Sequence, residues 1–217
     1  MSLQELAKKS KDILKKLDTP EKIQDFLNKI PMNFDYRKDT CMSPRMVLRK
    51  NKCHCIEGAV LAALCLKLNG KPPLILDLEA NKKDYDHVIA VFREEGRWGA
   101  ISKTNHSVLR YRDPIYNSIR ELVMSYFHEY TDKKGRKNLR KYSLPVNLGK
   151  FDKKNWATSE KDIWFIPEYL VKVRHYDLIS KKQRLNLRKA DKIEIDKDKL
   201  VEWRMGSKRN KFRIKAY

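Results

Sequence analysis

The sequence has little that would make it fibrous, disordered, secreted or membrane-spanning. Only 7 glycines and 8 prolines occur among its 217 residues, too few for a collagen-like or low-complexity chain. No apolar run approaches the roughly 18 residues that a membrane-spanning helix needs, and the first residues lack the apolar segment of a secretory signal. The 4 cysteines of such a chain are expected to be reduced thiols. We therefore expect a cytoplasmic globular protein without a membrane partner.

Acidic residues are also scarce: 28 Asp and Glu stand against 49 Lys and Arg, which gives a net charge of +21. The excess is concentrated in residues 131–217, which hold 26 basic and 11 acidic residues. A solvated surface explains such charge, and binding of nucleic acid or another polyanion through this basic C-terminal third is the alternative. No zinc-finger spacing or basic–aromatic recognition motif accompanies the charge. The charge alone therefore leaves both interpretations open.

Two basic stretches would carry such an interaction. Within residues 181–192 the basic side chains recur at near-helical spacing, which predicts a helix with one basic face. A second cluster fills residues 208–215 at the C-terminal end, where a solvated tail is the plainer interpretation. The residues of the first stretch are Lys181, Lys182, Arg184, Arg188, Lys189 and Lys192.

The hydrophobic pattern predicts an α+β fold. Residues 56–68 are apolar on almost every side, which is typical of a central buried helix. Gly96 lies in the turn expected between two strands, where a residue with positive φ is favoured. Helices are predicted over residues 2–17, 20–30, 43–48, 56–68 and 115–130, and strands over 74–78, 87–92 and 97–102. We expect residues 1–130 to form one domain, and residues 131–217 a basic, mainly helical extension packed on it.

Cys55 directly precedes the apolar segment expected to form the buried helix. Unpaired N–H groups and aligned peptide dipoles at a helix N-terminus favour a thiolate, which is the nucleophilic form of cysteine. A buried cysteine that only fills space at the end of a core helix is the alternative. Glu57, in the first turn, is explained by the helix dipole alone.

His87 begins a predicted strand and shares a face with Ile89 and Val91. Across the hairpin we expect Ser102 to lie almost directly opposite His87, where facing Cβ atoms approach to roughly 5 Å. Ser102 can then bond to one imidazole nitrogen while the other nitrogen faces the thiol. This order of nucleophile, base and orienting residue is that of thiol acyl-transfer enzymes. A histidine that is hydrogen-bonded only within the core is the alternative.

Several spacings around Cys55 occur in the order of one known family. An Ile-Pro ends the upstream helix, a Ser-x-x-x-x-Leu turn follows, and small or turn residues stand four, fifteen and seventeen positions after Cys55. The matching residues are Ile30-Pro31, Ser43 to Leu48, Ala59, Gly70, Pro72, His87 and the segment Trp98 to Thr104 that contains Ser102. In this order, residues from about 23 to about 114 resemble the transglutaminase-like superfamily of papain-type thiol domains.

The resemblance implies a central buried helix packed on an antiparallel sheet, with Cys55 as nucleophile and His87 as base. It implies amide or peptide hydrolysis, or acyl transfer, on a protein or peptide substrate, without a cofactor. Two residues depart from the family pattern: Ser102 replaces the usual Asp, and Cys53 stands where Gly is common. A module that has lost catalysis and binds a partner through its basic surface is therefore the alternative function. The oligomeric state stays open.

Other acids and ligands near these residues give further alternatives. Asp84 and Asp86 precede His87, and either can replace the missing acid, although turn residues need no such role. A zinc site is also conceivable, but the second paired motif of a zinc-binding sequence is missing. Its ligands would come from Cys53, His54 and Cys55 with Cys41, Cys65, His87 or His106.

Overall fold

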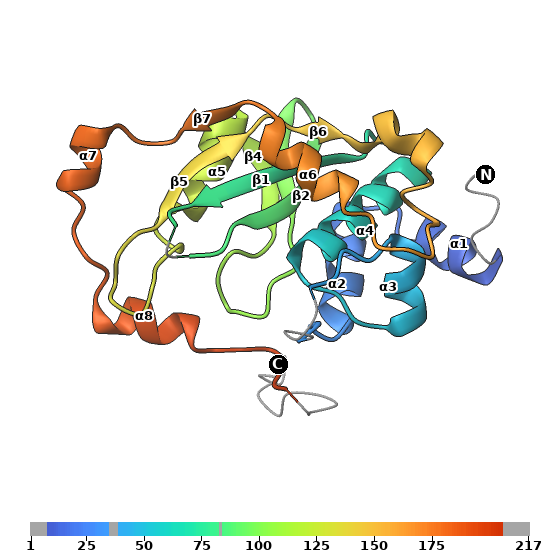
Figure 1. Cartoon of the computed structure of the whole chain (residues 1–217), viewed down its shortest axis with the longest axis horizontal. Helices are drawn as coiled ribbons and strands as arrows, with labels where there is room; N and C mark the ends of the chain where they lie inside the picture. The colour runs from blue at the N-terminus through green and yellow to red at the C-terminus, as the bar shows by residue number, and fades with distance from the viewer. Residues whose placement is uncertain (1–7, 35–38, 83, 206–217) are drawn as a thin grey trace.

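A computed structural model describes residues 8–34, 39–82 and 84–205 (Figure 1). The fold is α+β, with helices on both faces of an antiparallel seven-stranded sheet. The helices are α1 (Lys8–Lys15), α2 (Pro20–Lys29), α3 (Pro44–Lys50), α4 (Cys55–Leu68), α5 (Ile119–Phe127), α6 (Phe165–Lys172), α7 (Lys181–Leu185) and α8 (Lys192–Asp198), with the 3₁₀-helix η2 (Leu148–Lys154). The strands are β1 (Leu74–Ala80), β2 (His87–Glu94), β3 (Arg97–Ile101), β4 (Arg112–Tyr116), β5 (Leu139–Ser143), β6 (Val146–Asn147) and β7 (His175–Asp177).

The helices before the sheet begin at capping residues that the sequence makes recognisable. The Thr19 hydroxyl accepts a hydrogen bond from the backbone N–H of Lys22 at the start of α2, and Ser43 does the same for Met46 in α3. A proline follows each cap at the first helical position, where no N–H is needed. The predicted helices over 20–30 and 43–48 are thus confirmed within a residue or two.

Helix α4 is the centre of the larger of two hydrophobic cores, as predicted. From Ile56 to Leu66 every residue of the helix is buried. This helix packs with α1, α2, α3 and α6 on one face of the sheet, against Val88, Ala90 and Phe92 of β2. The alternate residues Ile89 and Val91 point to the second core, which α5 covers. Because both faces are covered, β2 reads as a continuous apolar run.

The strand order is β4-β3-β2-β1-β5-β7, with β6 also paired to β1. The predicted helix over 115–130 starts only at Ile119, because residues 112–116 form β4. Strand β4 contains Pro114, which is tolerated because β4 lies at the edge of the sheet. The segment after residue 130 was expected to be mainly helical, yet it supplies β5, β6 and β7 to the sheet (Figure 1). The boundary predicted at residue 130 therefore lies between strands of one sheet, and the division into a domain and an extension packed on it stays a prediction.

The prediction of one continuous basic helix over residues 181–192 is wrong. Helix α7 ends at Leu185 and α8 begins at Lys192, because Ser180 and Asp191 each start a new short helix as capping residues. Several basic side chains are paired with acids, among them Arg184 with Asp177 at 2.9 Å and Arg188 with Asp191 at 2.8 Å. The basic cluster at 208–215 lies outside the described residues. Within the described part of the chain, no helix is long and apolar enough to cross a membrane.

Candidate active site

Cys55 is the first residue of α4, and its neighbour His54 is the N-cap with extended backbone. The helix begins here because the carbonyl of His54 accepts the first intrahelical hydrogen bond, from the N–H of Gly58 at 2.9 Å. Cys55 is partly exposed, whereas Cys41, Cys53 and Cys65 are buried. Of the thiols in this chain, Cys55 is therefore the one that a ligand can reach.

The four thiols differ in acidity as sharply as in exposure. Burial by itself would raise the pKa of Cys55, but hydrogen bonds from the His54 and His87 side chains and the charges of both rings lower it to about 5. Burial raises the pKa of Cys53 to about 12 and that of Cys65 to about 12. The pKa of Cys41 is raised by burial and by the charge of Glu57. Of the four thiols, Cys55 is thus the one whose pKa is lowered, which favours its thiolate form.

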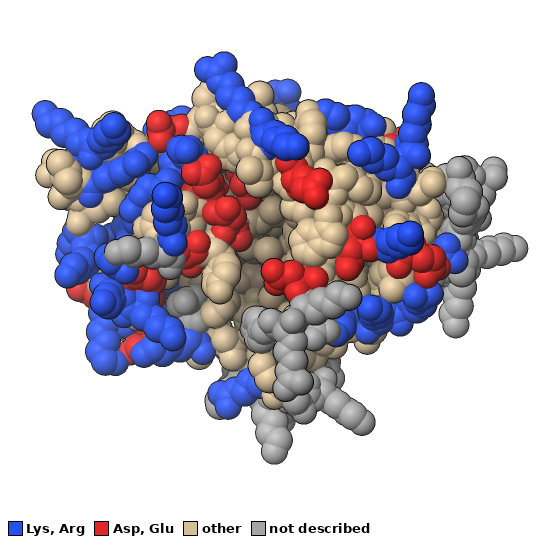
Figure 2. Space-filling model, in the orientation of Figure 1, with Lys and Arg blue, Asp and Glu red and all other residues tan. Residues whose placement is uncertain are grey.

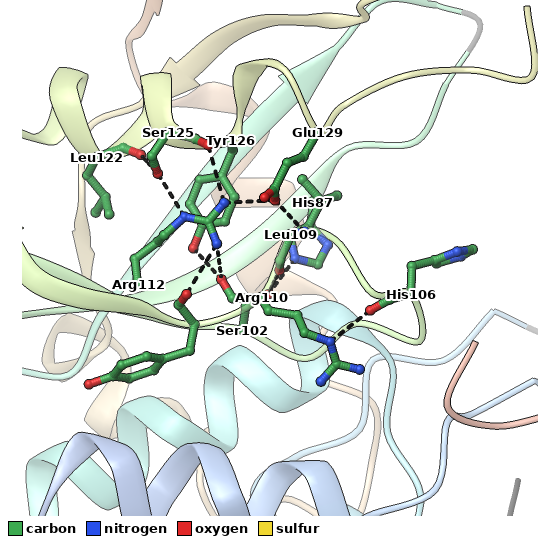
Figure 3. Close-up of polar contacts among 11 residues, drawn as sticks. His87, Ser102, His106, Leu109, Arg110, Arg112, Leu122, Ser125, Tyr126 and Glu129 are labelled. Carbon is green, nitrogen blue, oxygen red and sulfur yellow. Dashed lines mark hydrogen bonds and ion pairs between the residues drawn. The ribbon is translucent and has the colours of Figure 1, made fainter. Parts of the chain in front are cut away.

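The first residue of β2, His87, is hydrogen-bonded to Ser102, which directly follows β3 (Figure 3). The distance from His87 Nε2 to Ser102 Oγ is 2.8 Å. The Ser102 hydroxyl hydrogen is directed to the carbonyl of Leu109, with an oxygen–oxygen distance of 2.6 Å, so Ser102 Oγ accepts from His87. His87 Nε2 therefore carries a hydrogen, and Nδ1 is the ring nitrogen that can take a proton.

The alignment of His87 with Ser102 differs from the one predicted. The last residue pair of the β2–β3 ladder is Ala90 with Ile101, so continuing the register would set Ser102 opposite Ile89. The two residues are diagonal neighbours on one face, a relation that long side chains can span. The expectation that Ser102 faces His87 directly is therefore wrong, although the two side chains do meet.

Helix α2 fixes the backbone around Ser102. The side chain of Gln24 accepts a hydrogen bond from the N–H of Ser102 and donates one to its carbonyl, each at 2.9 Å. The next residue, Lys103, is buried and donates to the carbonyls of Leu27 and Ile30 at the end of α2. The Cβ of Lys103 packs against Gly58 of α4. If Gly58 carried a Cβ, that atom would lie only 2.4 Å from the Cβ of Lys103. Ser102 is thus held between two helices.

A second network supports the Leu109 carbonyl that Ser102 contacts (Figure 3). Leu109 has a positive φ of 58°, an uncommon conformation for a residue with a Cβ. Its N–H donates to Glu129 at 2.9 Å, and Glu129 is paired with Arg112 at 2.7 Å. Arg112 in turn donates to Ser125 of α5. The orienting group of His87 is therefore fixed from both sides of the sheet.

Glu57 has a larger role than the helix dipole predicted for it. The carboxylate is fully buried and accepts hydrogen bonds from the Thr40 hydroxyl at 2.7 Å, the Met42 N–H at 2.9 Å and the His54 N–H at 3.0 Å. Asn33 donates to it at 3.4 Å. Because the donors come from the irregular segment before α4, Glu57 binds that segment to the head of the helix.

The pocket that contains Cys55 and His87 has a volume of about 280 Å³ and lies between the head of α4 and the segment after α5. Its rim includes Asp84, Asp86 and Glu129. On the face shown in Figure 2, a central hollow is flanked by acidic side chains, while Lys and Arg lie toward the margins. A larger hollow, of about 550 Å³, is lined by no cysteine, histidine or acid among the described residues. The chemistry therefore favours the smaller pocket.

Neither aspartate before His87 takes the place of the missing acid by its hydrogen bonds. Asp84 accepts from the Asn138 side chain at 3.0 Å, and Asp86 accepts from the Ala80 N–H at 2.8 Å. In the described ranges no group of three or more Cys, His, Asp or Glu side chains is arranged to hold a metal ion. The hydrogen bonds that His87 makes therefore end at a neutral hydroxyl.

Residues near the C-terminal end of the described chain cover the loop after Ser102. Asn105 exchanges two side-chain hydrogen bonds with the backbone of Trp203, at 3.0 and 2.8 Å, and its carbonyl accepts from Glu202. Arg110 is paired with Glu202 at 3.1 Å. The basic C-terminal third thus supports the loop that carries Leu109.

Sequence patterns did not identify several residues that build this site. Gln24 is separated from Ser102 by 78 positions, and Glu129 from Leu109 by 20. A polar residue at an inward position of a helix, such as Gln24 between Ile23 and Leu27, was the one available signal. For Glu129 no such signal exists.

Comparisons with known proteins add little to this geometry. No protein-family model and no curated protein matches the chain significantly. Among solved structures, Legionella pneumophila LapG, described as EGTA-treated, aligns with 14% sequence identity and a TM-score of 0.39, over 68% of this chain and 82% of that one. This distant structural similarity assigns neither a family nor an activity to the chain.

Proposed function

We propose that the chain is a thiol-dependent enzyme of the transglutaminase-like type, which hydrolyses an amide or peptide bond or transfers its acyl group. Cys55 is the nucleophile, His87 the base, and Ser102 the residue that orients the imidazole. The observation that carries the proposal is a reachable Cys55 thiol in a pocket, hydrogen-bonded by His87, with its pKa lowered to about 5. A structural cysteine has no need of this arrangement.

The proposed reaction follows from the positions of the protons. The Cys55 proton passes to His87 Nδ1, and the sulfur attacks the carbonyl carbon of the substrate. His87 then returns the proton to the leaving amine, which leaves an acyl-thioester on Cys55. The N–H of Cys55 at the head of α4 is a donor for the oxyanion. Water or a second amine resolves the thioester, giving hydrolysis or acyl transfer.

Ser102 limits what this arrangement can achieve. A neutral hydroxyl fixes the ring tautomer but does not stabilise an imidazolium as a carboxylate does. Loss of the carboxylate from a serine triad lowers the rate by about 10⁴-fold. We therefore expect slow turnover if His87 acts alone. The rate at which the acyl-thioester is resolved then shows whether His87 has further support.

Acylation by an activated ester tests the proposal without knowledge of the substrate. The chain is mixed with p-nitrophenyl acetate, nitrophenolate release is followed, and the acetyl group is located by mass spectrometry. We expect a burst equal to one acetyl group on Cys55, followed by turnover that an added amine accelerates. Cys55→Ser should abolish the burst, and Cys53→Ser is the matched control that should keep it. A burst without turnover would support the binding-module alternative, and acetylation elsewhere would refute the proposal.

Polyanion binding is the second candidate function. Figure 2 shows Lys and Arg side chains gathered at the end of the molecule where α7 and α8 lie, which favours it. Ion pairs such as Lys192 with Asp196 reduce the charge available there. Fluorescence anisotropy with generic RNA and DNA at about 50 and 200 mM salt tests it. Binding weaker than roughly 10⁻⁴ M at the lower salt would leave the charge as surface solvation.

A further inference from the structure

The imidazole of His54, the N-cap residue directly before Cys55, is not part of the nucleophile–base–orienter scheme. The ring is partly buried, with 27% of the side chain exposed, and it is hydrogen-bonded to the Cys55 side chain. Glu57 accepts hydrogen bonds from the backbone N–H of His54 and from the hydroxyl of Thr40, whose carbonyl contacts the ring. The thiol therefore has two histidine partners, each with its own support.

The protonation of the His54 ring follows from its partners. His54 Nε2 lies 2.7 Å from the carbonyl oxygen of Thr40, which can only accept, so Nε2 carries a hydrogen. The same nitrogen lies 3.4 Å from a carboxylate oxygen of Glu57. Nδ1 is then the ring atom that can exchange a proton with the thiol. The tautomer is thus fixed on this side as Ser102 fixes it on the other.

We propose that His54 is a second acid–base partner of Cys55, and that Glu57 and the Thr40 carbonyl give it the anionic and dipolar support that Ser102 cannot give His87. On this second route to the nucleophile, the thiol proton moves from Cys55 Sγ to His54 Nδ1 in place of His87 Nδ1. The products are a thiolate and an imidazolium, so the total charge is unchanged. This proposal rests on the proposed function and adds a residue to its chemistry.

The charges around the pair favour this assignment. Burial by itself would lower the pKa of His54, but its hydrogen bond to Cys55, the charges of Glu57 and Cys55 and the bond to Thr40 raise it to about 9. Of the titratable groups that influence Cys55, the two imidazoles are the ones hydrogen-bonded to it. The charge of Cys55 in turn helps to raise the pKa of two buried thiols and a tyrosine, namely Cys41, Cys53 and Tyr130.

Matched glutamine substitutions separate the two imidazoles. Glutamine places its amide nitrogen near the position of Nε2, so His54→Gln can keep the bond to Thr40 and His87→Gln the bond to Ser102, while each loses its basic Nδ1. The thiolate is titrated by its ultraviolet absorbance and by the pH dependence of alkylation, and Cys55→Ser supplies the background of the other thiols. Circular dichroism checks that each variant is folded.

We expect each single variant to raise the pKa of Cys55, and the double variant to raise it further. The alkylation rate just above pH 6 should fall about tenfold for each pH unit by which the titration moves above that point. If His54→Gln leaves the titration unchanged and His87→Gln raises it, the His54 proposal is overturned and the dyad of the proposed function stands. If only His54→Gln acts, His54 is the partner and the dyad fails. If neither acts, both proposals fail.

A reciprocal measurement keeps the proposal testable should His54→Gln not fold. The ring nitrogens of His54 are followed by ¹⁵N NMR as the pH is raised, in the native chain and in Cys55→Ser. Since the thiolate favours the imidazolium, the His54 midpoint should fall in Cys55→Ser. An unchanged midpoint would mean that the ring does not share a proton with the thiol, and would overturn the proposal.

Discussion

The two sides of Cys55 support an imidazole in different ways. On the strand side, His87 bonds to Ser102, and the orientation of Ser102 depends on contacts from residues distant in the sequence, Gln24 and Leu109. On the helix side, His54 is held by Thr40 and by Glu57 in the first turn of α4, all within 18 residues of sequence around the start of that helix. One side ends in a neutral hydroxyl and the other in a fully buried carboxylate.

This difference shows where the negative charge missing from position 102 is found. A carboxylate on the strand would stabilise the His87 imidazolium directly. Glu57 instead lies at the N-terminus of α4, where a negative charge is already favoured by the helix dipole. A buried carboxylate is therefore electrostatically more favourable at the N-terminus of α4 than at the end of β3.

The largest effect should come from Glu57 on the helix side. Glu57→Gln places an amide donor among donors from Thr40, Met42 and His54, so at least one buried group loses its partner. We expect the free energy of unfolding to fall by about 3 kcal/mol, measured by urea denaturation. Ser102→Ala is the matched change on the strand side and should lose only about 1–2 kcal/mol. The reverse order would contradict the comparison.

Gly58 tests how closely the strand side is packed on α4. An ideal Cβ at Gly58 would lie 2.4 Å from Lys103 Cβ, so Gly58→Ala must displace the residue after Ser102. We expect a loss of about 1–3 kcal/mol in the free energy of unfolding. The sign is diagnostic, because the same change in an unhindered helix stabilises by up to about 1 kcal/mol. A higher unfolding temperature in Gly58→Ala would show that the contact between Gly58 and Lys103 is loose.

The smallest effect should come from restoring the acid on the strand side. In Ser102→Asp an anion next to His87 favours the imidazolium, and so the thiolate, which lowers the pKa of Cys55 further. The midpoint of alkylation should therefore move to lower pH. Ser102→Asn has a similar shape and no charge, and should not produce this shift. Equal midpoints in the two variants would mean that position 102 does not act on the pair through charge.

The sequence predicted those parts of the fold that local patterns determine. The caps at Thr19 and Ser43, the buried helix α4 and the hairpin turn at Gly96, with φ of 78°, each follow from residues close together in the chain. The strands β4 to β7 were missed. They are short and partly exposed, so they lack the apolar run that identified the central strands.

The candidate site divides in the same way. Cys55 and His87 were recognisable because a helix start and a strand start are local signals. The positions of Ser102 and Leu109 depend on a loop with a positive φ at Leu109 and on contacts from α2 and α5, which no periodicity encodes. For Glu57 the sequence indicated only an interaction with the helix dipole. Its hydrogen bonds were not predicted, because the donors come from an irregular segment.

The most direct test of the central claim is the pH dependence of alkylation at each of the four cysteines of the folded chain, resolved by mass spectrometry. As the pH rises through about 5, Cys55 should lose its proton and its rate should increase to a plateau, because the imidazoles hold the pKa of Cys55 at that value. The buried thiols, Cys41, Cys53 and Cys65, should stay unmodified over the same range. A Cys55 midpoint near the ordinary thiol value of about 8.5, or faster modification of Cys53 or Cys41, would contradict the account.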